Sequence, residues 1–449
     1  MNETVAGRIA EWVAGLRFEA LPPEVVERTK LLILDQFGVQ LLGATLPNVQ
    51  PVLRLAASQP GVAEATLTHS GARTTVSQAA WVNGTLGHSC EYDDAHALGW
   101  HTASAVVPAA LALAERDEKS GRDLITAVVA GTQVMALLGA ATPAMVATGW
   151  HGSKVLGVFG AAAAAGVILG LSPDQLTHAF GIAASDAGGT MEYDQSGGEV
   201  KRLHAGSASR SGLEAAELAK LGFTGPPTIF EGHRGIFQLF GGGGSVAAMD
   251  AAWDRWQVLD TIFRFYPCVA TVHAPLDAIR HLRETHDLKA ADVDRIRVGL
   301  VDFAVGHGAA ITRPADAISA QFSLAFGTGL RFVTGRNAPA DYVDPARWSD
   351  PEILAIGDLV QPYAMPIPDG DPVFSAKVEI VLHDGTTLEH YQAGFRGHPS
   401  HPATAAEVEG KFRENIAGLI AMERADALVA AVGKLDSGGP VSALLRPMG

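Results

Sequence analysis

A long apolar segment that begins at two consecutive prolines constrains the fold most. Pro22 and Pro23 lead into EVVERTKLLILDQFGVQLLG, in which apolar residues fall on most sides of a helix. Proline is favoured at the first helical position, and a helix that is apolar all round must be buried. We therefore expect a central helix surrounded by other helices. Asp35 lies inside it, and we expect this buried acid to be a structural group that bonds to the backbone or to an arginine.

Further helical patterns before residue 264 predict that the surroundings are helical too. Apolar residues recur at helical spacing within residues 3–16, 75–90, 104–116 and 121–139. Residues 155–171 are rich in Ala and Gly and fall short of a comfortable transmembrane span, so we expect a buried helix there. Ser172 to Gln175 form a capping box that opens the next helix.

The pattern changes at about residue 265. RIRVGLV (295–301) and SAKVEIVLH both show alternating β-branched residues, as strands do. The second of these segments is followed by an Asp384-Gly385 turn and then by TTLEHYQA, which together predict a hairpin. Helical patterns lie near residues 275–284 and 316–330, and residues 403–433 return to helix. We therefore predict a mainly α protein, with a large all-helical domain of residues 1–264 and 403–449 and a smaller α+β domain of residues 265–402.

Charge and cysteine content exclude several classes of function. The net charge of −15 argues against a nucleic-acid partner, and no basic tract suits a membrane surface. Glu3, Arg8 and Glu11 interrupt what would be the apolar part of a signal peptide, so we expect a cytoplasmic protein. Cys90 and Cys268 give no disulfide framework, and two thiolates are too few for an ordinary iron–sulfur cluster.

The run from His88 to His101 is the first candidate site. Glu91, Asp93, Asp94, His96 and His101 crowd a stretch that Gly99 and short polar residues keep from helical spacing. We expect a loop held between two buried helices, the second of which starts at Ser104 with Pro108 near its first turn. The alternatives are a solvated acidic loop whose histidines cap the helices, and a metal site, which no H-x-x-x-H or H-E-x-x-H spacing supports.

Two further groups of ionisable residues lie at expected helix starts. His151, Ser153 and Lys154 precede the apolar helix, and Lys201-Arg202-Leu203-His204 open an Ala-rich one. Cations at a helix start oppose the helix dipole, so binding of a carboxylate or phosphate is one explanation. The alternative is that Lys201 and Arg202 pair with upstream acids, namely Glu192, Asp194 or Glu199.

Six segments taken together resemble the MmgE/PrpD family, and the resemblance runs nearly end to end. They are NGTLGHSCEYDDAH, HTASAVVPAALALAE, KRLHAGSASRSGLEAAELAKLGFTGP, YPCVATVHAPLDA, AQFSLAFG and DGTTLEHYQAGFRGHP. This family includes 2-methylcitrate dehydratases, cis-aconitate decarboxylases and iminodisuccinate epimerases. The resemblance implies a homodimer, an α+β lid over the all-helical domain, an active site in the cleft between them, and no metal or organic cofactor.

These activities share the removal or delivery of a proton at a carbon next to a carboxylate, which needs a base, an acid and fixed cations. The resemblance implies His101 as the main acid/base, Lys201 as a carboxylate-binding or proton-transferring cation and His151 as a second imidazole, with Asp93 or Glu91 assisting. Further candidates for substrate binding are Arg264, Arg202, His273 and Cys268. In an apolar setting, however, His273 is more often a structural histidine.

The sequence departs from the family pattern at several positions. Glu91-Tyr92-Asp93-Asp94-Ala95-His96 stands where the family commonly has D-F-D-D-T-H. Arg264 replaces the usual lysine, and arginine cannot readily release a proton. A tyrosine, a glutamate and an arginine are exchanged for Phe326, Gln133 and Leu137.

From these observations we predict a cofactor-independent lyase that dehydrates a small anionic polycarboxylate resembling 2-methylcitrate. The alternative is an isomerase, an epimerase of a dicarboxylate resembling iminodisuccinate. Decarboxylation is less expected with Phe326 in place. A relative that binds an acid without catalysis is the alternative from another class.

Overall fold

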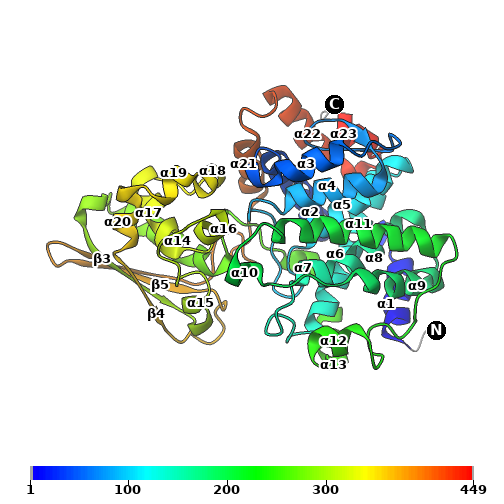
Figure 1. Ribbon diagram of the computed structural model, residues 1–449, viewed down its shortest axis with the longest axis horizontal. Coiled ribbons are helices and arrows are strands. Elements are labelled where there is room, and N and C mark those ends of the chain that lie inside the picture. Colours follow the sequence, from blue (N-terminus) through cyan, green and yellow to red (C-terminus); the bar gives the residue numbers. More distant parts are fainter. Residues whose placement is uncertain (1–3, 447–449) are drawn as a thin grey trace. The chain divides into compact units, whose positions relative to one another are not determined.

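The computed structural model describes residues 4–446, apart from the side chains of Asp194 and Gln195, and divides into two compact units. Unit 1 is Met1–Thr261 and Thr404–Gly449, and unit 2 is Ile262–Ala403 (Figure 1). The division falls after residues 261 and 403, whereas the sequence patterns placed it after 264 and 402. The Phe263 N–H donates to the Gly397 carbonyl oxygen at 3.1 Å, which ties the residues just after Thr261 to unit 2.

Unit 1 consists of helices around α2 (Pro23–Gly43), the long helix expected from the sequence. The other long helices are α1 (Val5–Gly15), α4 (Val76–Gly87), α5 (Thr102–Arg116), α6 (Gly121–Ala141), α8 (Gly157–Leu169), α9 (Pro173–Ala183), α11 (Lys201–Lys220), α21 (Ala405–Ile416) and α22 (Met422–Gly433). Shorter elements are α3 (Gln50–Ala57), α7 (Gly152–Val155), α10 (Tyr193–Ser196), α12 (Ile236–Gly241), α13 (Val246–Trp253), α23 (Ser442–Leu445) and the two-stranded β1 (Ala65–Thr66) and β2 (Arg73–Thr74). The structure is 57% helix and 9% strand, which confirms the mainly α prediction.

Small residues allow α11 to pack closely on α4 and α8. A Cβ added at Gly206 would lie 2.2 Å from the Trp81 carbonyl oxygen, and one at Gly212 would lie 2.3 Å from that of Val158. Only glycine permits such close approach of two helix backbones. The packing holds the N-terminal end of α11, which carries Lys201 and Arg202, against the rest of the unit.

Two stretches of unit 1 are long and apolar enough to cross a membrane, Gly121–Ala141 and Gly152–Leu169. In the apolar 18-residue window of each stretch, 94% and 89% of the residues are buried inside the protein. They are therefore core helices of unit 1. The second stretch consists of the short α7 and of α8, and α8 is the buried helix expected within residues 155–171.

The buried acid on α2 has a lysine partner. Lys411 Nζ on α21 lies 2.7 Å from Asp35 Oδ1, and each side chain is 1% exposed. The same ammonium donates to the Tyr92 carbonyl oxygen at 2.7 Å, so it also fixes the loop that follows α4. Asp35 is a structural group, as expected, but it pairs with a lysine instead of an arginine.

Unit 2 contains a four-stranded sheet of order β4-β3-β5-β6, formed by β3 (Val293–Leu300), β4 (Val360–Ala364), β5 (Ala376–Leu382) and β6 (Thr387–Gln392). β5 and β6 are antiparallel, with Val381 opposite Thr387, which confirms the hairpin. The helix α14 (His273–Thr285) packs on both strands. The remaining helices are α15 (Asp302–Gly306), α16 (Ala317–Gln321), α17 (Leu324–Thr334), α18 (Pro339–Val343), α19 (Pro345–Trp348) and α20 (Pro351–Gly357).

Several element boundaries differ from the sequence expectation. α5 starts at Thr102 instead of Ser104, so Pro108 lies inside the helix. The helices expected at residues 316–330 and 403–433 are each broken in two. Strand β4 was missed because its sequence, VQPYA, lacks clear alternation and contains Pro362, a residue that an edge strand tolerates.

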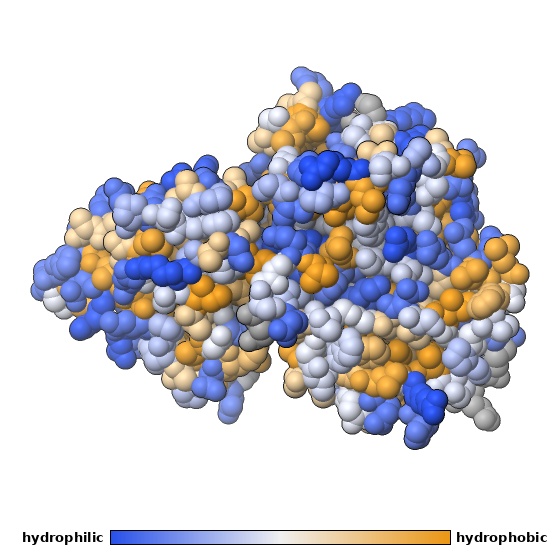
Figure 2. All heavy atoms as spheres, viewed as in Figure 1, coloured by the Kyte–Doolittle hydropathy of each residue, from blue (hydrophilic) through white to orange (hydrophobic). Residues whose placement is uncertain are grey.

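Polar and apolar side chains are mixed over the face that Figure 2 draws. Large exposed apolar side chains include Leu221 and Phe223, which are 84% and 60% exposed just beyond the end of α11. The expected homodimer stays a prediction.

Candidate active site

The loop between α4 and α5 is buried although it is rich in acids. Glu91, Asp93 and Asp94 are 2%, 0% and 0% exposed, and His88 at the end of α4 is 0% exposed. The interpretation as a solvated acidic loop is therefore wrong. The backbone of Glu91 has a φ of 52°, a conformation that a residue other than glycine adopts at a cost.

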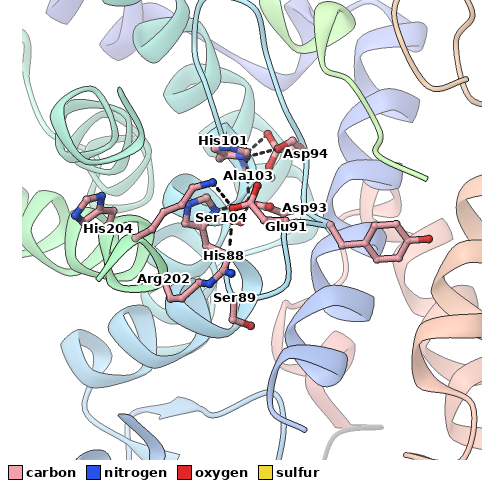
Figure 3. A network of polar contacts seen from close by, with 12 residues as sticks. His88, Ser89, Glu91, Asp93, Asp94, His101, Ala103, Ser104, Arg202 and His204 are labelled. Carbon is pink, nitrogen blue, oxygen red and sulfur yellow. Dashed lines mark hydrogen bonds and ion pairs between the residues drawn. The ribbon is translucent and has the colours of Figure 1, made fainter. Parts of the chain in front are cut away.

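Asp93 holds two histidines of this loop. Its Oδ2 accepts from His88 Nδ1 at 2.8 Å and from Ser104 Oγ at 2.6 Å, and lies 3.4 Å from His101 Nδ1 (Figure 3). The rings of His88 and His101 are 4.5 Å apart between centroids. The carboxylate thus fixes where both imidazoles point.

His101 has a defined tautomer because its Nδ1 faces a carbonyl oxygen. The distance from Nδ1 to the Asp94 oxygen is 2.6 Å, and a carbonyl can only accept. Nδ1 therefore carries the hydrogen, and in the neutral ring Nε2 holds the lone pair. An imidazole in this state can accept a proton at Nε2, as a general base must.

Asp94 is a second acid at the start of α5. One oxygen, Oδ2, accepts from Thr102 Oγ1 at 2.9 Å and from the Ala103 N–H at 3.0 Å, while Oδ1 has no hydrogen-bond partner among the described residues. Burial, and then the neighbouring charge of Asp93, raise the pKa of Asp94 well above its ordinary value, against the two hydrogen bonds that lower it. The sequence interpretation named Asp93 and Glu91 and did not assign a role to this residue.

Glu91 pairs with both cations at the N-terminal end of α11. Lys201 Nζ forms a close ion pair with Glu91 Oε1, and Arg202 Nη1 lies 3.1 Å from the same oxygen. Arg202 Nε is also 3.6 Å from the half-exposed Glu199. Glu199 was one of the expected upstream partners, but the main partner comes from the loop 110 residues earlier. The side chain of Asp194, another expected partner, lies outside the described residues.

His151 and His204 form a buried pair beside these groups. Their Nδ1 atoms are 2.9 Å apart, and the His151 ring lies 5.7 Å from His88 and 6.2 Å from His101 between centroids. Burial and then the cationic Lys201 lower the pKa of His151 well below its ordinary value, and burial lowers the pKa of His204 to about 4. Both imidazoles are therefore neutral at neutral pH.

The other candidates lie in unit 2 and make a network of their own. Arg264 Nη1 and His273 Nε2 both donate to the Cys268 carbonyl oxygen, at 3.4 and 3.1 Å. His273 is 0% exposed and its ring contacts Tyr266 and Phe395, with centroids 5.4 and 4.9 Å away. These contacts favour a structural role for His273.

Among the positions that depart from the family pattern, Gln133 is structural. Its Nε2 donates to the carbonyl oxygens of Trp253 and Arg255, and its Oε1 accepts from the Gln257 N–H at 3.0 Å. Leu137 is 0% exposed in the core. In unit 2, Phe326 packs edge-on against Tyr342 with centroids 5.6 Å apart.

His96 stabilises the loop through hydrogen bonds that its neutral ring makes, so the free energy of unfolding is expected to fall in acid. Its Nδ1 accepts from the N–H groups of Leu98 and Gly99, and its Nε2 donates to the Gln257 carbonyl oxygen. Burial lowers the pKa of His96 to about 4. Because this value lies below that of the unfolded chain, about 6.5, the stabilisation is complete above pH 6.5 and is lost as the pH falls through 4.

We therefore expect the free energy of unfolding, measured with urea between pH 7 and 4, to fall on acidification. The fall should be smaller in His96→Asn, whose side-chain oxygen can accept from the same N–H groups but does not titrate. Equal slopes in the two proteins would show that His96 is not the source.

Two models of one protein family together match most of the chain. The model of the MmgE/PrpD N-terminal domain matches residues 7–248, and that of the C-terminal domain matches residues 266–437. The chain belongs to the MmgE/PrpD family. The resemblance drawn from the six sequence segments is thus confirmed.

Several curated relatives of this chain are named cis-aconitate decarboxylase or cis-aconitate decarboxylase-like protein. A cis-aconitate decarboxylase-like protein, oryM, of Aspergillus oryzae is 28% identical over 98% of this chain and 96% of its own length. The cis-aconitate decarboxylase of Aspergillus terreus is 28% identical over 86% of this chain and 84% of its own. The human cis-aconitate decarboxylase is 27% identical over 97% and 92%. Membership together with these relatives supports a lyase-type activity.

Three residues of this MmgE/PrpD site were not assigned by the sequence, namely His88, Asp94 and Ser104. The pattern contained a signal for His88 and Asp94, since both lie in the run from His88 to His101 that the sequence singled out. A cavity of about 650 Å³ in unit 2 is a poor alternative site, because its lining includes Asp302, Asp369 and Asp371 and no basic side chain. Anionic substrates would be repelled there.

Proposed function

We propose that this protein is a cofactor-independent lyase of small polycarboxylates, in which His101 transfers a proton at a carbon next to a carboxylate. The observation that carries the proposal is the buried group formed by His101, His151 and the Lys201–Glu91 ion pair. Perturbed ionisable groups gathered in one buried place are typical of catalytic sites.

His101 Nε2 is the proposed proton acceptor. Its Nδ1 is committed to the Asp94 carbonyl oxygen, and Asp93 lies close enough to stabilise the imidazolium that forms. Positioned proton transfer of this kind contributes roughly 10²- to 10⁴-fold to a rate.

Lys201 and Arg202 supply the positive charge that a substrate carboxylate requires. Both cations pair with the single carboxylate of Glu91, so these three buried side chains together carry one net positive charge. Neutral His151 adds a polar ring without adding charge. A carbanion that develops beside a carboxylate would be stabilised by such fixed cations.

Two lyase reactions fit this arrangement. Dehydration of an acid resembling 2-methylcitrate is the reaction expected from the sequence, and Asp94, whose raised pKa favours its protonated form, could deliver a proton to the departing hydroxyl. Decarboxylation is favoured by a different observation, the names of the relatives described above. In dehydration the neutral His101 ring accepts the proton from carbon, whereas in decarboxylation the protonated ring donates a proton to the carbon that has lost carbon dioxide.

The test is an NMR assay of the purified protein in deuterated water with cis-aconitate, citrate, 2-methylcitrate and aspartate-like acids. We expect bond cleavage with one of them, seen as release of carbon dioxide or as loss of water to an alkene. Deuterium uptake with inversion and no cleavage would indicate the epimerase alternative instead. Thermal stabilisation without any exchange would indicate a binding protein, and either result would overturn the lyase proposal.

A further inference from the structure

Three histidines of unit 1 converge although they come from separate segments of the chain. His88, His101 and His151 each offer a ring nitrogen, and these three atoms all lie within 4.8 Å of one another. The residues are 0%, 8% and 1% exposed. The rings of His88 and His101 are 4.5 Å apart between centroids, and Figure 3 shows both residues beside Asp93.

We propose that His88, His101 and His151 form a binding site for one divalent transition-metal ion such as Zn²⁺. Three imidazoles and a water are a common ligand set for zinc. Zn–N bonds of about 2.0 Å place tetrahedral ligand atoms about 3.3 Å apart. The three ring nitrogens, now within 4.8 Å of one another, would need to approach by up to about 1.5 Å to complete the site.

One nitrogen of each ring already has a hydrogen-bond partner, as in most metal-binding histidines, and for His101 this partner is the Asp94 carbonyl oxygen. His88 Nδ1 bonds to the Asp93 carboxylate, and His151 Nδ1 bonds to His204 Nδ1. In both residues Nε2 is buried and has no hydrogen-bond partner in the part of the chain that the structure describes. A buried polar nitrogen without a partner costs free energy, which a metal bond at that atom would recover.

The charges around the rings permit a cation. Lys201, Arg202 and Glu91 leave one positive charge, and the Asp93 carboxylate in contact with His88 offsets its repulsion of a metal ion. Trp100 and Tyr193 stand edge-on to His151 with centroids 5.3 and 5.7 Å away, so one side is apolar.

Metal binding would compete with catalysis, a consequence that rests on the proposed function. His101 is the proposed base, and an ion on its ring removes the lone pair that accepts the proton. The ion would thus act as an inhibitor and not as a cofactor.

The experiment measures binding without reference to activity. Chelator-treated protein is dialysed against micromolar Zn²⁺, and bound metal is counted by mass spectrometry. We expect one tightly bound ion per chain, with affinity reduced roughly 100-fold or more in His88→Gln and in His151→Gln, and 10- to 100-fold in Asp93→Asn, which loses only the orienting carboxylate. His178→Gln is the matched control, because His178 bonds to the Gly225 carbonyl oxygen away from the cluster and should leave the affinity unchanged.

Circular dichroism of each variant checks folding, and crystals of the unaltered protein soaked in Zn²⁺ provide a measurement that needs no variant. Anomalous density among the three rings would support the site. Density at other histidines only, or equal zinc binding by the unaltered protein and both glutamine variants, would overturn it. Because binding is counted directly, a protein that binds zinc here but turns over no acid would refute the proposed function and leave the metal site standing.

Discussion

His101→Ala is expected to lower turnover of the best acid by roughly 10²- to 10⁴-fold, the usual contribution of a positioned general base. Nδ1 of this ring donates to the Asp94 carbonyl oxygen and lies near the Asp93 carboxylate, so the ring is fixed and its Nε2 is the basic atom. Alanine removes the base and leaves the Lys201–Glu91 pair in place. The loss should therefore appear in kcat, with a smaller change in KM.

Solvent deuterium exchange into the same acid is the second measurement, because it reports proton transfer even if product release limits turnover. His178→Ala is the matched control, since it deletes a part-buried histidine of unit 1 that lies outside the cluster. Exchange by His101→Ala at the rate of the control would remove His101 from its proposed role.

Glu91→Gln is expected to destabilise unit 1 by about 3–5 kcal/mol, the usual cost of removing one partner of a buried ion pair. Glu91 is 2% exposed and is the carboxylate shared by Lys201 and Arg202. Glutamine keeps the size of the side chain and accepts the same φ of 52° about as well, so the change isolates the charge. Without the carboxylate, two buried cations lose their main counter-charge.

Tryptophan fluorescence during urea unfolding suits this measurement, because six of the seven tryptophans belong to unit 1. Glu199→Gln is the control, since it removes a half-exposed carboxylate 3.6 Å from the same Arg202 and should cost about 1 kcal/mol or less. Similar small losses in both variants would mean that solvent compensates the Lys201 and Arg202 charges, and the argument for a surplus of buried positive charge would fail.

Local signals in the sequence predicted much of the fold. Pro22-Pro23 and the apolar residues after them located α2, and the capping box at Ser172 located the start of α9. The alternation around Asp384-Gly385 predicted the β5–β6 hairpin. These features depend on neighbours within a few residues, so periodicity is sufficient to detect them. Where the local signal is weak, as in the Pro-containing edge strand β4, the prediction failed.

The sequence by itself determined that histidines and acids crowd the loop after α4, that cations open α11, and, through its motifs, to which family the chain belongs. Only the tertiary structure decided that the loop is buried, that Glu91 receives Lys201 and Arg202, and that His88, His101 and His151 converge. The reason is physical. Burial and ion pairing join segments 110 or more residues apart through the packing of α4, α5 and α11, and no local pattern records which side chains that packing brings together.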